Sequence, residues 1–249
     1  MSWQALEEEL ARWREAGRSA DFWWRDDDAA ALTAPLRQLL ELARTSGVPL
    51  ALAVVALEAE PELFEGLPAS VLMHGTDHRN RAANGEKKTE FPSYEPDEEA
   101  LARLGAARER LARLAGARFV AVLAPPWNRF KRELAARLPE CGLHGISGYG
   151  ARSGAQSVPG VTQVNTHVDI IDWRGSRGFT GEEPALRAAV KHLAARRCGG
   201  ADAAEPTGWL THHALHDAAT RAFLERLFER TRRLGARWHD SQALFPSRP

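Results

Sequence analysis

Cysteine is scarce in this sequence, which has only Cys141 and Cys198 among its 249 residues. Two cysteines are too few for a disulfide framework, and these two do not form a Cys-x-x-Cys pair. We therefore expect both to be packing residues. Net charge is also missing, because 33 Lys and Arg residues balance 33 Asp and Glu residues. The overall charge thus favours neither nucleic acid nor an anionic membrane as a partner, although it leaves room for a local charged patch.

Long apolar runs are absent as well. No stretch of about 18 uncharged apolar residues occurs, so no transmembrane segment is predicted. Residues 1–10 are acidic and amphipathic, without the basic start and apolar core of a secretory signal, and we expect a cytoplasmic protein. The composition that remains is ordinary for a globular protein, with 44% hydrophobic and 27% charged residues. The length permits a substantial buried core.

One pattern recurs about six or seven times along the chain: an apolar strand, a polar tip and a helix. The strands are predicted to begin near residues 21, 49, 71, 119, 143, 161 and 208. Such repetition predicts parallel strands covered by helices, in either a barrel or a doubly wound sheet. No linker divides the chain, so residues 1–249 are predicted to form one domain, with a helix within residues 1–20 packed on it.

A pair of histidines follows the apolar run of residues 71–73. His74 and His78 are four positions apart, and a buried strand that ends in this way brings two imidazoles to one place. Neutral imidazole nitrogens are good ligands for a divalent metal. The alternative is a chance pair on a solvated helix or loop. The flanking residues Asp77, Arg79 and Asn80 are expected to support the two imidazoles.

Other predicted strand ends carry carboxylates, an aromatic residue and further histidines. They are Asp26-Asp27-Asp28, Pro125-Pro126-Trp127, Asp169 with Asp172, and His212-His213. The acidic triplet also suits a solvated loop or a helix cap, and Trp127 also suits a rigid turn with its ring in the core. In a closed barrel these ends would converge on one pocket, whereas an open sheet would spread them along an edge. The polar loop of residues 79–96 is long enough for a lid or a substrate wall.

In this order, the motifs resemble those of the polysaccharide deacetylases, the nodulation-type deacetylase homology domain of carbohydrate esterase family 4. The resemblance extends from Trp24 to Asp217. It rests on five segments: Asp26-Asp27, His74 to His78, Pro126-Trp127, Asp169 to Trp173, and Leu210-Thr211-His212. The fold that it implies is α/β, a distorted (β/α) barrel of about seven parallel strands in a single domain.

The resemblance also implies a role for each matching residue. A divalent metal, zinc before cobalt or nickel, would be bound by three side chains: Asp27, His74 and His78. Asp26 would be the general base and His212 the general acid, with Asp172 orienting and charging His212. The site would be lined by four further residues: Pro126, Trp127, Trp173 and Leu210. Leu210 would form an apolar wall for the acetyl methyl group.

Two departures from the family pattern affect this assignment. Asp28 stands where the family has a small glycine, so the register within the triplet is open by one residue. Ala124 stands where the family has an arginine, and we hypothesise that Arg25 supplies the missing positive charge. His213 is a candidate for contact with substrate or metal, and His167 is a weaker one whose alternative is a core position. The remaining histidines are expected to be structural: His144, His192 and His239.

The predicted function is that of a metal-dependent hydrolase that removes an acetyl group, N-acetyl before O-acetyl, from a sugar. The substrate would be an acetylated sugar, a glycolipid or a glycan precursor, with no nucleic acid partner. One alternative is hydrolysis of a non-sugar C–N bond by the same site. Another is a non-catalytic binding protein on the same barrel, although such a protein would have no chemical need for the whole catalytic set.

Overall fold

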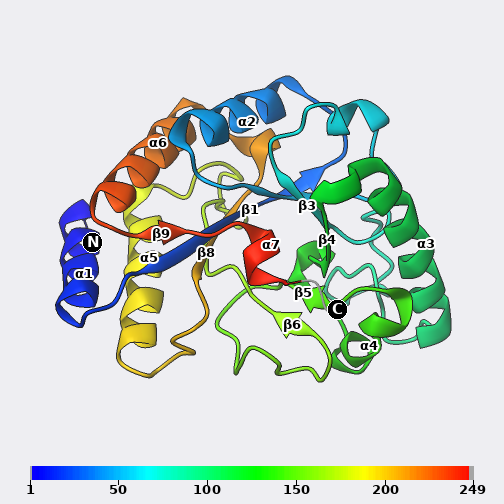
Figure 1. The fold of residues 1–249 in the computed structure, drawn as a ribbon. Helices are drawn as coiled ribbons and strands as arrows, with labels where there is room; N and C mark the ends of the chain where they lie inside the picture. Colours follow the sequence, from blue (N-terminus) through cyan, green and yellow to red (C-terminus); the bar gives the residue numbers. More distant parts are fainter. Residues whose placement is uncertain (1, 247–249) are drawn as a thin grey trace.

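The computed structural model describes residues 2–246, so residues 1 and 247–249 of the predicted domain lie outside the described part. Within it, one parallel sheet forms the centre of the molecule (Figure 1). Its strands are β1 (Asp21–Ala29), β2 (Ala51–Val54), β3 (Ser70–Met73), β4 (Phe119–Leu123), β5 (Gly145–Ile146), β6 (Thr162–Gln163), β7 (Val168–Asp169), β8 (Thr207–Thr211) and β9 (Arg237–Trp238). The order is β6-β5-β4-β3-β2-β1-β8-β7, and β9 also pairs with β1. The predicted distorted α/β barrel is confirmed, with eight strands in the main order.

The barrel is distorted because its two ends do not meet. β6 and β7 lie at opposite ends of the strand order and are each two residues long, and within residues 2–246 they do not pair with each other. An isolated bridge between Tyr149 and Thr166 connects the backbone in this region. The sheet is therefore a curved open barrel rather than a closed cylinder.

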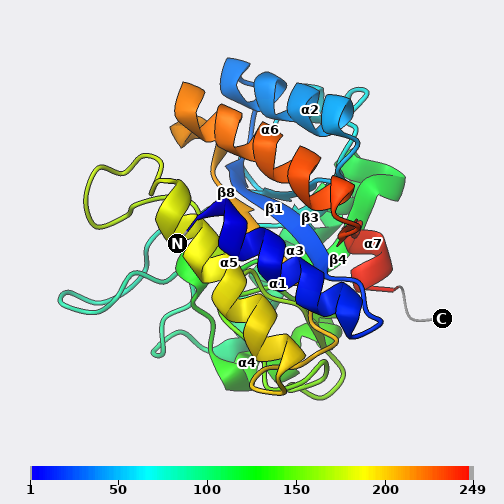
Figure 2. The same cartoon turned by 90° about the vertical axis from the view of Figure 1, so that its left-hand side faces the viewer.

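Helices cover the outer face of the sheet. They are α1 (Trp3–Glu15), α2 (Ala34–Ser46), α3 (Asp97–Ala115), α4 (Arg132–Ala136), α5 (Glu182–Arg197), α6 (Ala218–Arg233) and α7 (Ser241–Leu244). The side chain of Thr33 caps α2, and Asp217 begins α6 with a capping box. Figure 2 shows α1 lying beside α5, where Arg197 donates to Glu9 at 2.7 Å. The N-terminal helix thus packs on the helical layer.

Side chains of β1 alternate between the barrel interior and the helical layer, as they do in any strand. The ring of Trp24 packs against Phe228 of α6, with 4.8 Å between ring centroids. Trp23 instead packs in the interior with Leu72 and Val122. Both tryptophans are fully buried. Arg25 and Asp27 therefore share the interior side with Trp23, while Asp26 faces the helical layer with Trp24.

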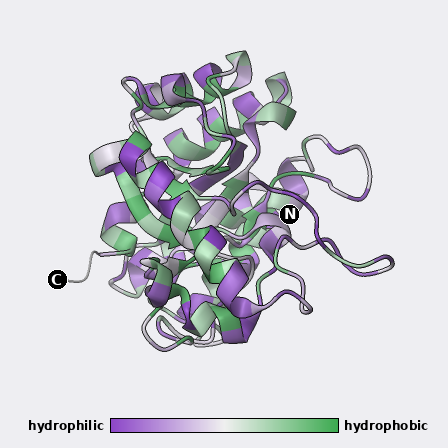
Figure 3. Ribbon diagram, turned by 90° about the vertical axis from the view of Figure 1, so that its right-hand side faces the viewer, coloured by the Kyte–Doolittle hydropathy of each residue, from purple (hydrophilic) through white to green (hydrophobic). Residues whose placement is uncertain are grey.

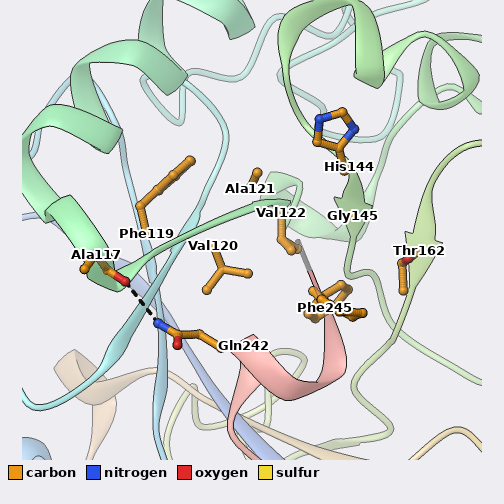
Figure 4. Close-up of a pocket in the computed structure, with 11 residues that line it drawn as sticks. Ala117, Phe119, Val120, Ala121, Val122, His144, Gly145, Thr162, Gln242 and Phe245 are labelled. Atoms are coloured by element: carbon orange, nitrogen blue, oxygen red, sulfur yellow. Dashed lines mark hydrogen bonds between the residues drawn. The ribbon is translucent and has the colours of Figure 1, made fainter. Parts of the chain in front are cut away.

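The C-terminal segment closes the amino-terminal end of the barrel. A cavity of about 360 Å³ lies there, with Phe245 at its wall and Gln242 donating to the carbonyl oxygen of Ala117 at 3.1 Å (Figure 4). Among the described residues that line it, His144 is the one titratable group. The polar strand tips lie at the opposite, carboxyl end. The cavity therefore offers little chemistry and stands apart from those tips.

Two long loops extend from one side of the molecule. They comprise residues 79–96 and 170–181 (Figure 2), and Figure 3 shows that the first is predominantly hydrophilic. Each loop follows a strand tip that carries predicted site residues, after β3 and β7 respectively. In the part of the chain that is described, no helix combines the length and the apolar character needed to cross a membrane.

Candidate metal centre and catalytic site

Three side chains from the ends of β1 and β3 meet at one point. Oδ1 of Asp28 lies 3.0 Å from Nε2 of His74 and 3.3 Å from Nε2 of His78. Nδ1 of His74 is 2.9 Å from the carbonyl oxygen of Ala124, which can only accept, so Nδ1 carries a proton and Nε2 is the nitrogen that faces Asp28. One carboxylate and two imidazoles held in this way fit a divalent metal such as zinc.

The carboxylate in this group belongs to Asp28, whereas the sequence-based assignment places Asp27 there. The pairing of β1 with β2 shifts register between Asp26 and Ala29, and Asp28 has a left-handed φ of 71°. The resulting bulge turns the last carboxylate of the triplet toward the two histidines. Regular strand alternation does not predict this bulge, so it cannot show which of the three aspartates faces the histidines.

The electrostatics of the group reflect its close contacts. Burial alone would raise the pKa of Asp28, but hydrogen bonds from His74 and His78 outweigh it and hold that pKa below its ordinary value. Burial opposes the charged form of His74, yet the charges of Asp27 and Asp28 raise its pKa. The charge of His212 also acts on Asp28. The tips of β1, β3 and β8 therefore converge.

Arg25 and Asp27 form a buried ion pair on the interior side of β1. Nε and Nη2 of Arg25 donate to the two carboxylate oxygens of Asp27 at 2.8 and 2.9 Å. The other donors reach Ser147, through its carbonyl and hydroxyl oxygens at 2.7 Å, and Oδ1 of Asn128 at 3.1 Å. Oδ2 of Asp27 lies 4.0 Å from Nδ1 of His74. Asp27 thus stands beside the group of Asp28, His74 and His78, called the metal-type group below, with its orientation fixed by an arginine.

Asp26 lies on the other side of the strand, away from this pair. Its carboxylate accepts from the Thr211 hydroxyl and is bonded to Nδ1 of His213, both at 2.6 Å. Thr211 in turn accepts from Nε1 of Trp24 at 2.9 Å. Burial would lower the pKa of His213, but the hydrogen bond to Asp26 raises it. The structure does not bring Asp26, the predicted base, to the metal-type group, because strand alternation turns it toward the helical layer.

His212 follows β8 and is largely buried. Its ring meets the ring of Trp173 edge to face, with 4.8 Å between centroids. Nε1 of Trp173 donates to Oδ2 of Asp169 at 2.7 Å. Burial raises the pKa of Asp169, while the charge of His212 lowers it and that of Asp27 raises it further. Asp169, the last residue of β7, rather than Asp172 of the loop, is therefore the carboxylate that interacts with His212.

Asp172 organises its own turn instead. Its carboxylate accepts from the backbone N–H groups of Gly175 and Ser176, both at 3.0 Å. A hydrogen bond from Ser176 is the main reason that the pKa of Asp172 lies below its ordinary value. The geometry thus places Asp172 in a turn-capping position, where its charge is taken up by the backbone.

Apolar and aromatic residues form the walls. The ring of Trp127 lies 4.6 Å from the ring of His78, as measured between centroids. Pro126 and Leu210 are buried, and Leu210 pairs in register with Arg25 across β8 and β1. Trp127 is thus a partly exposed neighbour of the metal-type group and not a core residue.

Unusual backbone conformations gather at this site. In residues 2–246, five non-glycine residues have a left-handed φ: Asp28, His78, Trp127, Asn128 and Arg177. The first four belong to the site just described, and Arg177 lies in the loop that carries Trp173. Such conformations cost about 1–3 kcal/mol each and persist where the surroundings impose them, which is common at functional sites.

Glu90, which the sequence-based assignment missed, anchors the histidine turn. Its fully buried carboxylate accepts from the backbone N–H of Thr76 at 2.8 Å and from the Thr76 hydroxyl. A Cβ on Gly75 would meet Glu90 at 2.0 Å, so only glycine fits above this carboxylate. Asp77, expected to support an imidazole, pairs instead with Arg81 at 2.7 Å. The support behind His74 and His78 thus comes from the far end of the loop of residues 79–96.

The side chains of Arg79 and Asn80 also make contacts within the loop of residues 79–96 and its start. Arg79 is 3.6 Å from Asp77, and Oδ1 of Asn80 accepts from the backbone N–H groups of Ala82 and Thr89. These contacts order the loop rather than the imidazoles. Glu90 lies 12 residues after His78 in the sequence, and no local pattern predicts its contact with Thr76, because that contact forms only when the loop folds back.

A second cluster of metal-type side chains does not fit a metal. It comprises His167, His192 and Glu205, all buried. Nδ1 of His167 accepts from the Gly208 N–H at 3.0 Å, so Nε2 carries the proton and faces Glu205 at 3.2 Å. The rings of His167 and His192 stack 3.5 Å apart and nearly parallel, so their in-plane lone pairs cannot converge on one ion. His167 and His192 are core histidines, and His239 pairs with Asp21.

This stack predicts loss of stability in acid. Burial, together with the neighbouring His167, lowers the pKa of His192 to about 2, whereas the unfolded chain titrates near 6.5. The stabilisation is therefore complete above pH 6.5 and falls by about 1.4 kcal/mol per unit as the pH drops toward 2. At pH 4.5 we expect the free energy of unfolding to be lower by about 2–3 kcal/mol from this residue.

Urea unfolding of the parent and of His192→Gln between pH 4.5 and 7.5 measures the effect. The variant should lose most of this acid dependence, and His144→Gln serves as the matched control. Equal pH slopes for His192→Gln and the parent would contradict the assignment.

Comparisons with known proteins support the fold. No model of a known protein family matches the sequence, and no curated protein matches it. Solved structures do match. The Bc1960 peptidoglycan N-acetylglucosamine deacetylase is similar with a TM-score of 0.60 and 16% identity, over 92% of this chain and 90% of that one. The family 4 carbohydrate esterase from Streptomyces lividans matches with a TM-score of 0.53 and 16% identity, over 84% and 86% of the two chains.

A similar structure without this activity is also known. The pseudoenzyme BA3943 of family 4 from Bacillus anthracis matches with a TM-score of 0.56 and 14% identity, over 88% of this chain and 63% of that one. At such identities the likeness concerns the fold and leaves the activity to be argued from the site. The chain has the fold of the family 4 carbohydrate esterases, the deacetylases that its motifs resemble.

Proposed function

We propose that this chain is a metal-dependent hydrolase that removes an acetyl group, N-acetyl foremost, from a sugar or glycan precursor. The observation that carries the proposal is the Asp28, His74 and His78 group with the Arg25-held carboxylate of Asp27 beside it. The shared fold with deacetylases supports the same conclusion.

Asp28, His74 and His78 would hold the metal, with zinc preferred over cobalt or nickel. The assignment is shifted by one residue from the sequence-based one, in which Asp27 was the ligand. When bound, a divalent ion of this kind supplies Lewis acidity toward the amide carbonyl and lowers the pKa of water. The remaining chemistry belongs to the protein's own side chains.

Asp27 takes the role of general base in place of Asp26. Its carboxylate is fixed by Arg25 and accepts the proton of the attacking water. His212 protonates the leaving amine, and its ring is held edge to face by Trp173, which also binds Asp169. Trp173 holds Asp169 in place. Leu210, Pro126 and Trp127 provide the walls against which the acetyl group and the sugar would pack.

Acetate release tests this proposal. Purified protein, stripped with a chelator and reloaded with zinc, cobalt or nickel, is offered N-acetylated sugars, nucleotide sugars and glycolipids. We expect metal-dependent acetate release from at least one of them. Release only from non-sugar amides would favour the alternative C–N hydrolase. Stoichiometric metal with no release from any acetylated substrate would contradict the proposal and favour a binding protein.

A further inference from the structure

The turn that carries Trp173 also carries two arginines. The guanidinium of Arg177 lies 5.8 Å from the centre of the Trp173 ring, and that ring contacts His212. Arg174 is on the same turn, and both arginines are exposed. This loop extends outward on the same side of the molecule as the loop of residues 79–96 (Figure 2). The exposed indole ring of Trp173 therefore lies between the guanidinium of Arg177 and His212, the proposed general acid.

The two cations are not neutralised. Within residues 2–246, no carboxylate lies within ion-pair distance of Arg174 or Arg177, whereas Arg81 pairs with Asp77 and Arg103 with Glu95. The nearest acid in sequence, Asp172, already binds the backbone of its own turn. Both guanidinium groups therefore keep their donors for a group outside the chain.

The backbone holds Arg177 in a costly conformation. Its φ is 57°, a region that suits glycine or asparagine, and its N–H donates to the carbonyl oxygen of Asp172 at 2.9 Å. The four other non-glycine residues with such a φ in the described part contribute side chains to the proposed catalytic site. An arginine at this position is thus presented by a turn that would fold more easily with glycine.

We propose that the turn of residues 172–177 binds an anionic group, a phosphate or a carboxylate, on the amine-bearing part of the substrate. The inference rests on the proposed function, because His212 protonates the leaving amine and so marks where that part lies. A guanidinium forms two parallel hydrogen bonds with either anion, and Trp173 offers a flat apolar surface for the sugar ring. The substrate class is therefore an acetylated amino sugar with a nearby negative charge.

Matched substrates test the inference. The parent is assayed with N-acetylglucosamine, its 1-phosphate and 6-phosphate, and N-acetylmuramic acid, at low and high salt. We expect KM for at least one anionic substrate to be about tenfold or more below that for the neutral sugar, with the difference shrinking in high salt. Arg177→Asn, which tolerates the left-handed φ, should remove most of this preference, and Arg177→Lys should retain part of it.

Arg44→Gln, which removes an exposed arginine on α2, is the control and should leave all KM values unchanged. Acetate release that is equal for neutral and anionic sugars in the parent and in Arg177→Asn would overturn the inference and leave the proposed function intact. If no sugar releases acetate, the proposed function fails. Calorimetric binding of the two sugar phosphates to the parent and to Arg177→Asn then decides the inference, and equal affinities would overturn it.

Discussion

Asp28→Ala should lose the metal, whereas Asp27→Asn should keep the metal and lose catalysis. The Asp28 carboxylate lies within 3.0–3.3 Å of both histidine Nε2 atoms, while Asp27 is committed to Arg25. Removal of a general base lowers kcat by about 10²–10⁴-fold. Elemental analysis measures the metal content of each variant, and acetate release from a substrate found by the screen measures kcat.

The adjacent carboxylate provides the matched control for this pair. Asp26→Asn keeps the size of the side chain and faces Thr211 and His213, so it should retain the metal and most of the activity. The three variants are thus expected to differ: Asp28→Ala loses the metal, Asp27→Asn keeps the metal but loses activity, and Asp26→Asn keeps both. Metal loss in Asp27→Asn together with full metal in Asp28→Ala would restore the sequence-based register and refute ours.

Arg25→Gln should destabilise the protein by about 3–5 kcal/mol, because it leaves the Asp27 carboxylate buried without its cation. Both side chains are almost fully buried, and the guanidinium also binds Ser147 and Asn128. Urea unfolding near neutral pH measures the loss. Arg25→Lys should also be destabilising, since an ammonium cannot replace the planar contacts.

A double variant distinguishes the charge from the packing. Arg25→Met combined with Asp27→Leu removes both charges and should recover much of the stability while having no activity. Arg44→Gln, an exposed arginine beside Glu41, should change the free energy of unfolding by no more than about 0.5 kcal/mol. A loss below 1 kcal/mol for Arg25→Gln would show that Asp27 does not depend on Arg25.

The order of strand and polar tip predicts parallel strands covered by helices, because buried parallel strands are nearly continuous apolar runs that end abruptly, and the family resemblance then favours the barrel over an open doubly wound sheet. His74 and His78 were found for the same reason, since they stand directly after such a run. The motif order also identified the deacetylase fold, which the solved structures confirm. The strands and the histidine pair follow from local sequence and the strand period, and the fold follows from the order of the motifs.

The remaining site features depend on geometry that no local pattern contains. The register of the acidic triplet depends on a bulge at Asp28. The link between Asp169 and His212 depends on the direction of the loop of residues 170–181, which places Trp173 against both. Asn128, Ser147 and Glu90 reach the site only because distant segments fold over it. The hypothesis that Arg25 compensates for Ala124 stays a prediction, although its pairing with Asp27 rather than Asp26 gives it a definite partner.

The central position of β1 has a consequence for synthesis of the chain. β1 is made first among the strands but pairs with β8, about 185 residues later, with Trp24 opposite Trp209 in the register and Trp24 donating to Thr211. Until β8 emerges from the ribosome, β1 presents an unpaired edge next to several large aromatic side chains. Such long-range pairing slows folding and exposes apolar edges to aggregation. We expect chaperone dependence to be greatest for nascent chains that end between residues 170 and 205.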